Sequence, residues 1–408
     1  HDISAGGLIT TLLEMCFSNM EGGMEINLNK IKENDIIKIL FAENPGIVIQ
    51  VKDKDKAEVK KILEDAGIGY VKLGTPTDER HILVTKEDAT YQFGIDYLRD
   101  VWYSTSYLLD RKQSMNGCAK KRFENYKEQP LEFVFDKSFT GKFSQYGITP
   151  ERRTPTGIKA AIIREKGTNG EREMAYMLYL AGFDVKDVTM TDLISGRETL
   201  EDINMIVFCG GFSNSDVLGS AKGWAGAFLF NPKAKAALDN FYARKDTLSL
   251  GVCNGCQLMI ELGLINPEHN KKAKMLHNDS HKFESKFVGV TVPMNRSVML
   301  GSLSGSKLGI WVAHGEGKFS LPYEEDKYNV VLKYSYDEYP GNPNGSDYSV
   351  AGLASPDGRH LAMMPHLERS CFPWQNAYYP ADRIKNDQIT PWMEAFVNAR
   401  KWIEMNKK

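Results

Sequence analysis

The run GVCNGCQ at residues 251–257 constrains the fold of this chain more than any other feature. It is a G-x-C-x-G pattern between an apolar stretch at 247–250 and a helix-like stretch at 258–262. Glycines on both sides of Cys253 let the backbone turn sharply from a strand into a helix, as in a nucleophile elbow. The helix dipole at such a turn favours a thiolate. The pattern therefore predicts a strand, a tight turn and a helix, with an exposed and reactive thiol at Cys253.

The sequence around this run alternates between strand and helix patterns. Strands are predicted over 158–163, 183–188 and 203–208, and helices over 170–181 and 233–244. This alternation is typical of an α/β fold with a doubly wound, mainly parallel sheet, whose sites lie at the carboxyl ends of the strands. The final third instead predicts β pairs, including 349–354 with 359–364 around a turn at 356–358.

The first part of the chain has a different pattern. It predicts a helix after Gly6 and Gly7 that is capped by residues 2–4. It also predicts strands over 24–28 and 46–51, helices over 34–42 and 57–66, and two further short strands up to 84. Residues 91–126 look helical and 129–156 look irregular. We therefore expect an α+β domain over 1–90, a linker over 91–156 and the α/β domain over 157–408. Because the chain opens at a helix entry, we expect a C-terminal fragment of a longer protein.

Composition excludes several classes of protein. The 408 residues carry a formal net charge of -2, which argues against a nucleic-acid partner. We find neither an apolar run long enough to span a membrane nor a secretory signal. The six cysteines are scattered, unlike a secreted disulfide scaffold, and we expect them to be reduced. We therefore expect a soluble, cytoplasmic protein with no membrane or nucleic-acid partner.

A cysteine nucleophile needs a base, and the base needs an acceptor that orients it. His366 and Glu368 stand two residues apart directly after a predicted strand, and His314 and Glu316 have the same spacing. In an extended segment, this spacing places both side chains on one face. A surface pair is the alternative for either motif. Spacing alone leaves both pairs open.

Two further features near the elbow have competing interpretations. The run CGGFS at 209–213 offers backbone N–H groups to an oxyanion, or it is only a tight exit from a strand. Cys253 and Cys256 form a C-x-x-C pair, which also suggests redox chemistry or a metal site. No second cysteine or histidine pair stands at zinc-finger spacing, so we expect Cys256 to pack within the helix.

Several motifs in fixed order carry a family resemblance. They are CGGFS at 209–213, GVCNGCQ at 251–257, AHGEG at 313–317 and PHLER at 365–369. Upstream stand HDISAGGL at 1–8, LEM at 13–15, LFAE at 40–43 and LRDVWYSTSY at 98–107. The downstream set closely resembles the class I glutamine amidotransferase domain of the phosphoribosylformylglycinamidine synthase family. The upstream set resembles the C-terminal part of its second synthetase-like repeat.

The resemblance implies a glutaminase site. By matching positions, Cys253 is the nucleophile, His366 the base and Glu368 its orienter, while His314 lines the substrate site. We expect Cys253 to attack the amide of glutamine and a water activated by His366 to hydrolyse the thioester that results.

The same resemblance implies how the substrate is held. The oxyanion is expected to accept hydrogen bonds from the N–H of Asn254 and from that of Gly210 or Gly211. Gln257 and Phe212 are expected to contact the substrate. The glutaminase step itself requires no cofactor.

The resemblance also implies the wider reaction, which is that of a ligase of purine biosynthesis. Glutamine and ATP convert formylglycinamide ribonucleotide into formylglycinamidine ribonucleotide, glutamate, ADP and phosphate. Ammonia passes internally to the synthetase site, and ATP and Mg are expected to bind mostly outside this fragment. The family often has Asp where this chain has Ala5, so Asp2 is the candidate metal ligand, with a helix cap as the alternative. The rival functions are a cysteine-elbow hydrolase without a synthetase partner and a catalytically inactive binding module.

Overall fold

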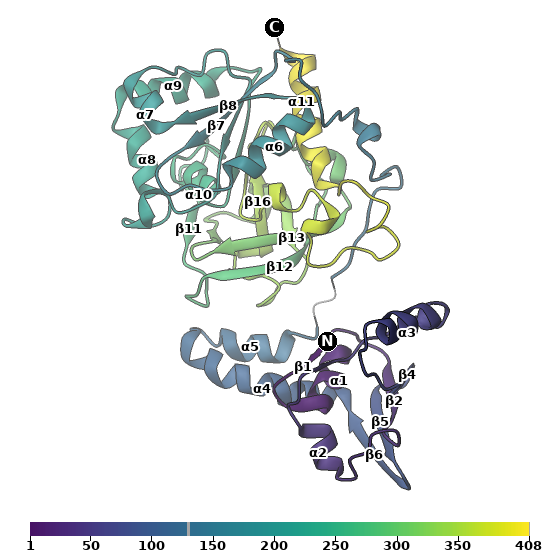
Figure 1. Ribbon diagram of the computed structural model, residues 1–408. Helices are drawn as coiled ribbons and strands as arrows, with labels where there is room; N and C mark the ends of the chain where they lie inside the picture. Colours follow the sequence, from purple (N-terminus) through teal and green to yellow (C-terminus); the bar gives the residue numbers. More distant parts are fainter. Residues whose placement is uncertain (129–130, 408) are drawn as a thin grey trace. The chain divides into compact units, whose positions relative to one another are not determined.

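The computed structural model describes residues 1–128 and 131–407. The start of the predicted irregular stretch, at residue 129, lies outside these residues. The chain separates into two compact units, His1–Lys112 and Gln113–Lys408, each with its own internal packing (Figure 1). Within the described ranges, no helix combines the length and the apolar character needed to cross a membrane.

The first unit is an α+β domain. Its strands are β1 (Asp2–Ile3), β2 (Gly23–Asn27), β3 (Gly46–Ile47), β4 (Gly74–Thr77), β5 (His81–Lys86) and β6 (Ala89–Gly94). Its helices are α1 (Gly7–Phe17), α2 (Ile36–Phe41), α3 (Lys56–Asp65) and α4 (Ile95–Gln113). Strands β4, β2, β5 and β6 form one sheet in that order, while β1 pairs with β3. Buried apolar side chains of α1, β2 and β5 form the core of this unit.

Three local predictions for this unit are wrong. The N-cap of α1 is Gly6, in a left-handed conformation without a side-chain cap, and Asp2 instead pairs with Ile47 in β1. The strand expected over 46–51 is only the two-residue β3. Residues 91–94 belong to β6 rather than to a helix, because β5 and β6 form a hairpin that turns at Glu87, where φ is 53°. A Glu-Asp turn lacks the Asn-Gly signal by which such hairpins are recognised.

The second unit contains a nine-stranded sheet with the order β13-β12-β15-β16-β17-β10-β9-β7-β8. Its strands are β7 (Lys159–Arg164), β8 (Asp184–Thr189), β9 (Met205–Phe208), β10 (Leu248–Val252), β12 (Glu284–Thr291), β13 (Lys307–His314), β15 (Asn329–Tyr334), β16 (Val350–Ala354) and β17 (His360–Met363). Strands β8, β7, β9, β10 and β17 run parallel, and the other pairs are antiparallel. The predicted parallel sheet and the later β pairs are both confirmed. A separate antiparallel pair is formed by β11 (Lys274–Leu276) and β14 (Lys318–Ser320).

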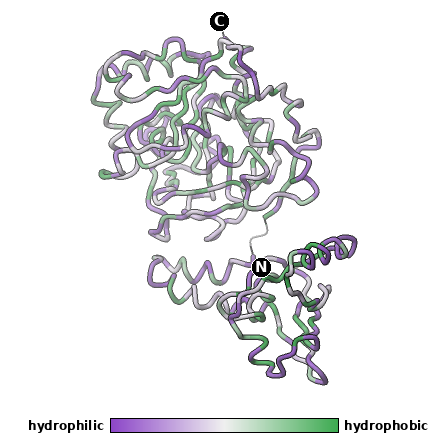
Figure 2. The backbone as a smooth tube through the Cα atoms, viewed as in Figure 1, coloured by the Kyte–Doolittle hydropathy of each residue, from purple (hydrophilic) through white to green (hydrophobic). Residues whose placement is uncertain are grey.

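Helices cover both faces of this sheet, as in other doubly wound folds. One face carries α6 (Glu171–Ala181) and α11 (Trp392–Asn406), and the other carries α7 (Met190–Ser195), α8 (Lys222–Leu229), α9 (Pro232–Ala243) and α10 (Asn254–Glu261) (Figure 1). Strands β9 and β10 are buried along their whole length. Figure 2 shows the apolar segments gathered in this central region. The carboxyl ends of β9, β10 and β17 therefore meet within a rigid core.

The segment before β7 belongs to the second unit and packs against its sheet. It contains α5 (Cys118–Asn125) and then runs without regular strands through residues 131–156. Val134 nevertheless exchanges backbone hydrogen bonds with Lys307 of the edge strand β13, at 2.8 and 3.1 Å. The aromatic ring of Phe133 lies 5.7 Å from that of Tyr379. This irregular segment is thus attached to the sheet.

The predicted elbow is confirmed, but its glycines serve a different purpose from the expected one. Between β10 and α10, Cys253 itself adopts the strained conformation, with φ 52° and ψ -107°. A Cβ on Gly255 would lie 2.0 Å from the carbonyl oxygen of Phe208 in β9. A Cβ on Gly251 would lie 2.5 Å from the carbonyl oxygen of Gly255. The glycines are needed because the helix backbone approaches the sheet closely.

We therefore expect Gly255→Ala to destabilise the second unit by about 1–3 kcal/mol, because the added methyl group forces α10 away from β9. Gly301→Ala is the matched control, since its Cβ would meet nothing nearer than 3.7 Å. Urea unfolding followed by circular dichroism measures both changes. Equal stability of the two variants would show that the close approach is not required.

Candidate active site

Cys253 lies at the junction of β10 and α10 and is only 5% exposed. The prediction of an exposed thiol is therefore wrong. Its Sγ lies 3.4 Å from the carbonyl oxygen of Ala313, at the end of β13. His366, which follows β17, pairs with Trp311 of the edge strand β13. The sheet therefore curls, and β13 returns to the elbow. The curl encloses the thiol.

His366 and Glu368 form a buried pair next to the cysteine. Nδ1 of His366 lies 2.6 Å from Oε1 of Glu368, and the imidazole also has a hydrogen bond with Cys253. The segment is not extended throughout as predicted, because Glu368 lies in the 3-10 turn Leu367–Arg369. The turn, rather than strand alternation, brings the carboxylate back to the ring. Cysteine, imidazole and carboxylate thus form a continuous chain of contacts.

The protonation of His366 follows from its neighbours. Burial by itself would lower the pKa of His366, but the Glu368 carboxylate and the hydrogen bond with Cys253 outweigh burial and raise this pKa to about 10. The ring is therefore an imidazolium at neutral pH. The ring can therefore donate a proton to a leaving group.

The loop after β9 lies against both reactive side chains. A Cβ on Gly210 would lie 2.8 Å from Cε1 of His366 and 3.4 Å from Cβ of Cys253. Gly211 has a φ of +122°, and a Cβ there would clash with Thr168 at 2.6 Å. Gly210 and Gly211 are therefore needed because the loop passes close to neighbouring atoms, as well as for the exit from β9.

Asn254 and Gln257 connect this loop to the first turn of α10. The Oδ1 atom of Asn254 accepts the backbone N–H of Ser213 at 3.1 Å, and its Nδ2 donates to Oε1 of Gln257 at 3.0 Å. Nε2 of Gln257 donates to the carbonyl oxygen of Glu316 at 2.7 Å. Both ends of the Gln257 amide therefore bond within the protein, and these bonds hold the turn in place.

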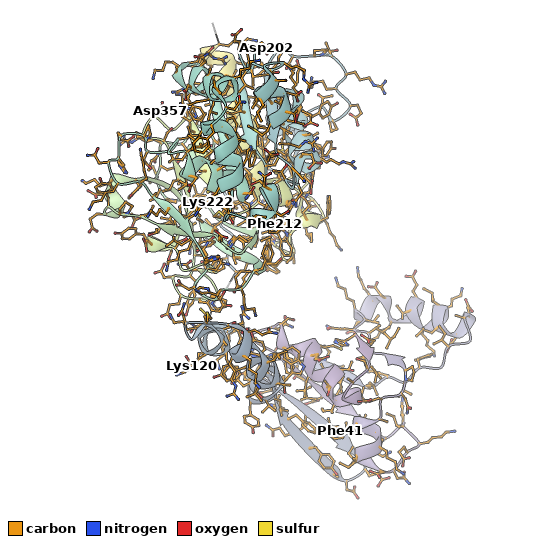
Figure 3. The ribbon with its side chains drawn as sticks, turned by 90° about the vertical axis from the view of Figure 1, so that its left-hand side faces the viewer. Phe41, Lys120, Asp202, Phe212, Lys222 and Asp357 are labelled. Carbon is orange, nitrogen blue, oxygen red and sulfur yellow. The ribbon has the colours of Figure 1, made fainter. Side chains whose placement is uncertain are left out.

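Phe212 has a different setting from the other predicted residues. It is 47% exposed, and its ring lies 5.8 Å from that of Phe283 (Figure 3). Its backbone N–H donates to the carbonyl oxygen of Gly167 at 2.9 Å. The side chain is thus free to contact a ligand while the backbone is fixed.

The second candidate pair, His314 and Glu316, does not form. Nδ1 of His314 lies 3.1 Å from Oδ1 of Asn278, while the Glu316 carboxylate accepts the N–H of Ser220 at 3.2 Å. Burial and the charge of His366 lower the pKa of His314 to about 3. Sequence reasoning missed Asn278, because it stands 36 residues before its partner and nothing in its local pattern marks it.

Asp2 lies in the first unit, exposed, with its carboxylate 3.5 Å from Nδ1 of His1. Across the described residues, no group of three or more His, Cys, Asp or Glu side chains is arranged to hold a metal ion. A metal contact by Asp2 stays a prediction.

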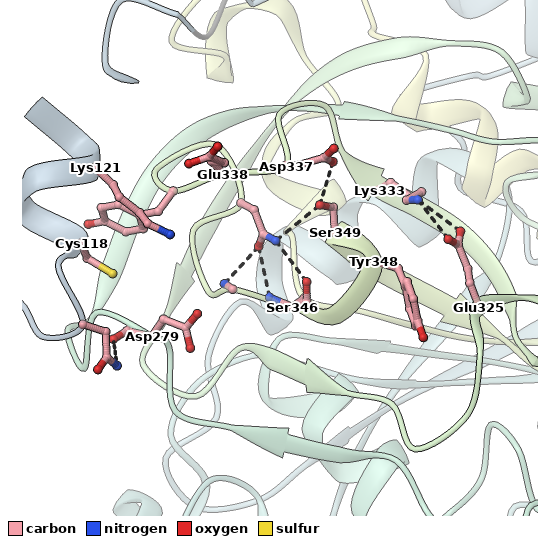
Figure 4. A pocket seen from close by; sticks show the side chains of 14 residues that line it. Cys118, Lys121, Asp279, Glu325, Lys333, Asp337, Glu338, Ser346, Tyr348 and Ser349 are labelled. Carbon is pink, nitrogen blue, oxygen red and sulfur yellow. Dashed lines mark hydrogen bonds and ion pairs between the residues drawn. The ribbon is translucent and has the colours of Figure 1, made fainter. Parts of the chain in front are cut away.

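A separate cavity of about 550 Å³ lies elsewhere in the second unit (Figure 4). Its walls include Cys118 and Lys121 of α5, together with Asp279, Asn342 and Ser346. Some of its polar groups are bonded to each other, as where Asn342 bridges the backbone N–H and carbonyl of Ser346. Neither Cys253 nor His366 lines this cavity.

Comparison with known proteins identifies two families along the chain. Residues 157–403 match the model of the CobB/CobQ-like glutamine amidotransferase domain, and residues 1–86 match that of the AIR synthase related protein, C-terminal domain. The chain is 27% identical to a solved structure described as PurLQS from Thermotoga maritima, with a TM-score of 0.46. That likeness covers 62% of this chain and 99% of the other.

Two curated relatives match almost the whole chain. A probable phosphoribosylformylglycinamidine synthase, chloroplastic/mitochondrial, of Arabidopsis thaliana is 38% identical over 99% of this chain and 30% of its own length. The phosphoribosylformylglycinamidine synthase of Homo sapiens is 39% identical over 98% of this chain and 32% of its own length. The chain thus spans about a third of the length of these relatives. Through its match over more than half of its residues, the chain belongs to the family of CobB/CobQ-like glutamine amidotransferase domains.

Proposed function

We propose that the second unit hydrolyses glutamine, with Cys253 as nucleophile, His366 as proton donor and base, and Glu368 as its orienter. The observation that carries this proposal is the continuous contact from the elbow cysteine through the buried imidazole to the carboxylate. We also propose the domain limits 1–90, 91–156 and 157–408, with the glutaminase as the last.

The chemistry begins with attack of the Cys253 sulfur on the carboxamide carbon, which turns the carbonyl into an oxyanion. The N–H of Asn254 and that of Gly210 or Gly211 are the proposed donors to this oxyanion. His366 then gives its proton to the amide nitrogen, the C–N bond breaks, and ammonia leaves. A thioester between Cys253 and the glutamyl group remains.

The second half-reaction reverses the role of His366. The neutral imidazole removes a proton from water, and the hydroxide oxygen attacks the thioester carbon. Glutamate leaves, and Cys253 and His366 return to their starting state. Glu368 keeps its contact with Nδ1 of His366 and holds the ring in place. Phe212 and Gln257 are proposed to border the glutamine pocket.

The names of the curated relatives suggest the wider role. We propose that the chain works within a phosphoribosylformylglycinamidine synthase, where its ammonia reacts with formylglycinamide ribonucleotide activated by ATP and Mg. The glutaminase step needs no cofactor. A cytoplasmic location is part of this proposal, and it fits six cysteines that are all unpaired in the structure, since reducing compartments keep thiols free.

Alkylation by an electrophilic glutamine analogue tests the nucleophile. We expect a chloromethyl ketone analogue to label Cys253 alone, with protection by free glutamine, because the thiol lies beside an imidazolium. Cys253→Ala should lose both the adduct and glutaminase activity. Cys256→Ala is the control, since Cys256 is fully buried in the core and should leave labelling intact. Peptide mass spectrometry locates the adduct, and an unprotected adduct or one at Cys256 would refute the proposal.

The buried pair makes a prediction about pH. Because the folded His366 pKa of about 10 exceeds the unfolded value of about 6.5, the pair stabilises the fold fully below about pH 6.5. That stability is lost as the pH rises through 10.

We expect Glu368→Gln to lower the His366 pKa by roughly 1 to 3 units and to lower kcat by about 100-fold or more. NMR titration of labelled histidine measures the pKa, and Glu316→Gln, which removes a carboxylate bonded elsewhere, should leave it unchanged.

The wider role has its own test in a complete synthase that contains this chain. We expect Cys253→Ala to abolish synthesis of formylglycinamidine ribonucleotide from glutamine and to spare synthesis from added ammonia, because only the nitrogen source is lost. Product formation from each nitrogen donor is measured at saturating ATP. Loss of both activities would contradict separate glutaminase and synthetase sites.

A further inference from the structure

Asn278 fixes the tautomer of His314. The Nδ2 group of Asn278 donates to the carbonyl oxygens of Lys282 and His314, at 2.9 and 2.7 Å. This leaves Oδ1 as the acceptor, and it receives the backbone N–H of Gly317 at 3.0 Å. Since Oδ1 also lies 3.1 Å from Nδ1 of His314, that ring nitrogen must carry the hydrogen. Nε2 of His314 therefore has a lone pair and no proton.

The lone pair on Nε2 is buried and unused. His314 is 2% exposed, and its Nε2 has no hydrogen-bond partner in the part of the chain that the structure describes. The ring cannot easily move to find one, because the Cα of Gly317 packs against it so closely that a Cβ there would lie 2.5 Å from Nδ1. Buried acceptors without a partner are rare in proteins, so the missing donor comes from a group outside the chain, either a bound ligand or a water.

The position of His314 indicates which ligand that is. The residue before it, Ala313, contacts the sulfur of Cys253, and Glu316 receives the hydrogen bond from Gln257. Residues 313–316 therefore run along the first turn of α10, beside the nucleophile. The backbone N–H of His366 bonds to the carbonyl oxygen of Trp311 at 2.8 Å, three residues before His314, so both histidines lie at this end of β13.

We propose that Nε2 of His314 accepts an N–H from the carboxamide nitrogen of bound glutamine and thereby selects the amide over the acid. This inference rests on the proposed glutaminase function. A carboxamide offers an N–H to a neutral acceptor, whereas the carboxylate of glutamate offers only oxygen lone pairs, which Nε2 repels. His314 forms no covalent bond and stays neutral. The same contact disfavours retention of the product, because glutamate lacks the donor.

Two substitutions test the Nδ1 and Nε2 positions of the His314 ring separately. In His314→Asn the side chain reaches the Nδ1 position and can retain the bond to Asn278, but it has no atom at the Nε2 position. In His314→Gln the longer side chain can place its oxygen near Nε2. We expect His314→Asn to lose most of the preference for glutamine over glutamate, by about tenfold, and His314→Gln to keep it within about threefold.

The readout uses the full 408-residue chain. Cys253 is alkylated by the chloromethyl ketone analogue, and the concentrations of glutamine and of glutamate that halve this rate are compared. The analogue carries no amide N–H, and the labelling rate of each variant without competitor is its own reference. An unchanged ratio of the two concentrations in His314→Asn would overturn the inference. Labelling of the wild-type chain that glutamine does not protect would instead refute the glutaminase function itself.

A second measurement uses the wild-type chain, so its result does not depend on whether the variants fold. The ¹⁵N resonance of His314 Nε2 in the wild-type chain should have the shift of an unprotonated nitrogen and should move when glutamine binds. It should not move when glutamate is added. A protonated Nε2, or a resonance that glutamine leaves in place because a buried water already satisfies it, would overturn the inference.

Discussion

The active-site geometry depends on the contact between the backbones of α10 and β9. With no side chain at Gly255, the helix approaches to the point where only a hydrogen atom fits against the Phe208 carbonyl. The short turn that remains holds Cys253 at a φ of 52° and a ψ of -107° and places it at the ends of the neighbouring strands. The other groups of the site lie on α10 itself or follow strands that end at the same edge, namely β9, β17 and the returning β13.

Two histidines in this buried space have opposite protonation because their partners differ by one functional group. The carboxylate of Glu368 holds His366 as a cation, whereas the carboxamide of Asn278 leaves His314 neutral. Burial alone disfavours charge on both rings. The positive charge on His366 further discourages a second cation nearby. The His366 ring is thus suited to donating a proton, and the His314 ring to accepting a hydrogen bond.

The sequence predicts those features that depend on local pattern. The elbow at Cys253 and the parallel strands follow from glycine spacing and apolar periodicity. The choice between His366 and His314 does not follow, because it depends on how the sheet curls and brings Trp311 beside His366. Burial of the thiol has the same origin. Spacing left the two pairs equal, and only the family resemblance favoured His366, which the structure places against Glu368.

The pairing of Val134 with Lys307 bears on where the glutaminase unit can be separated from the rest of the chain. Strand β13 is the outer strand of the sheet, and unpaired backbone groups on such a strand invite pairing with other molecules. The segment before β7 covers one end of this strand, and His366 covers part of the other. A fragment beginning at residue 157 would lose the first cover and become prone to association through β13. A soluble glutaminase piece should therefore begin before Val134.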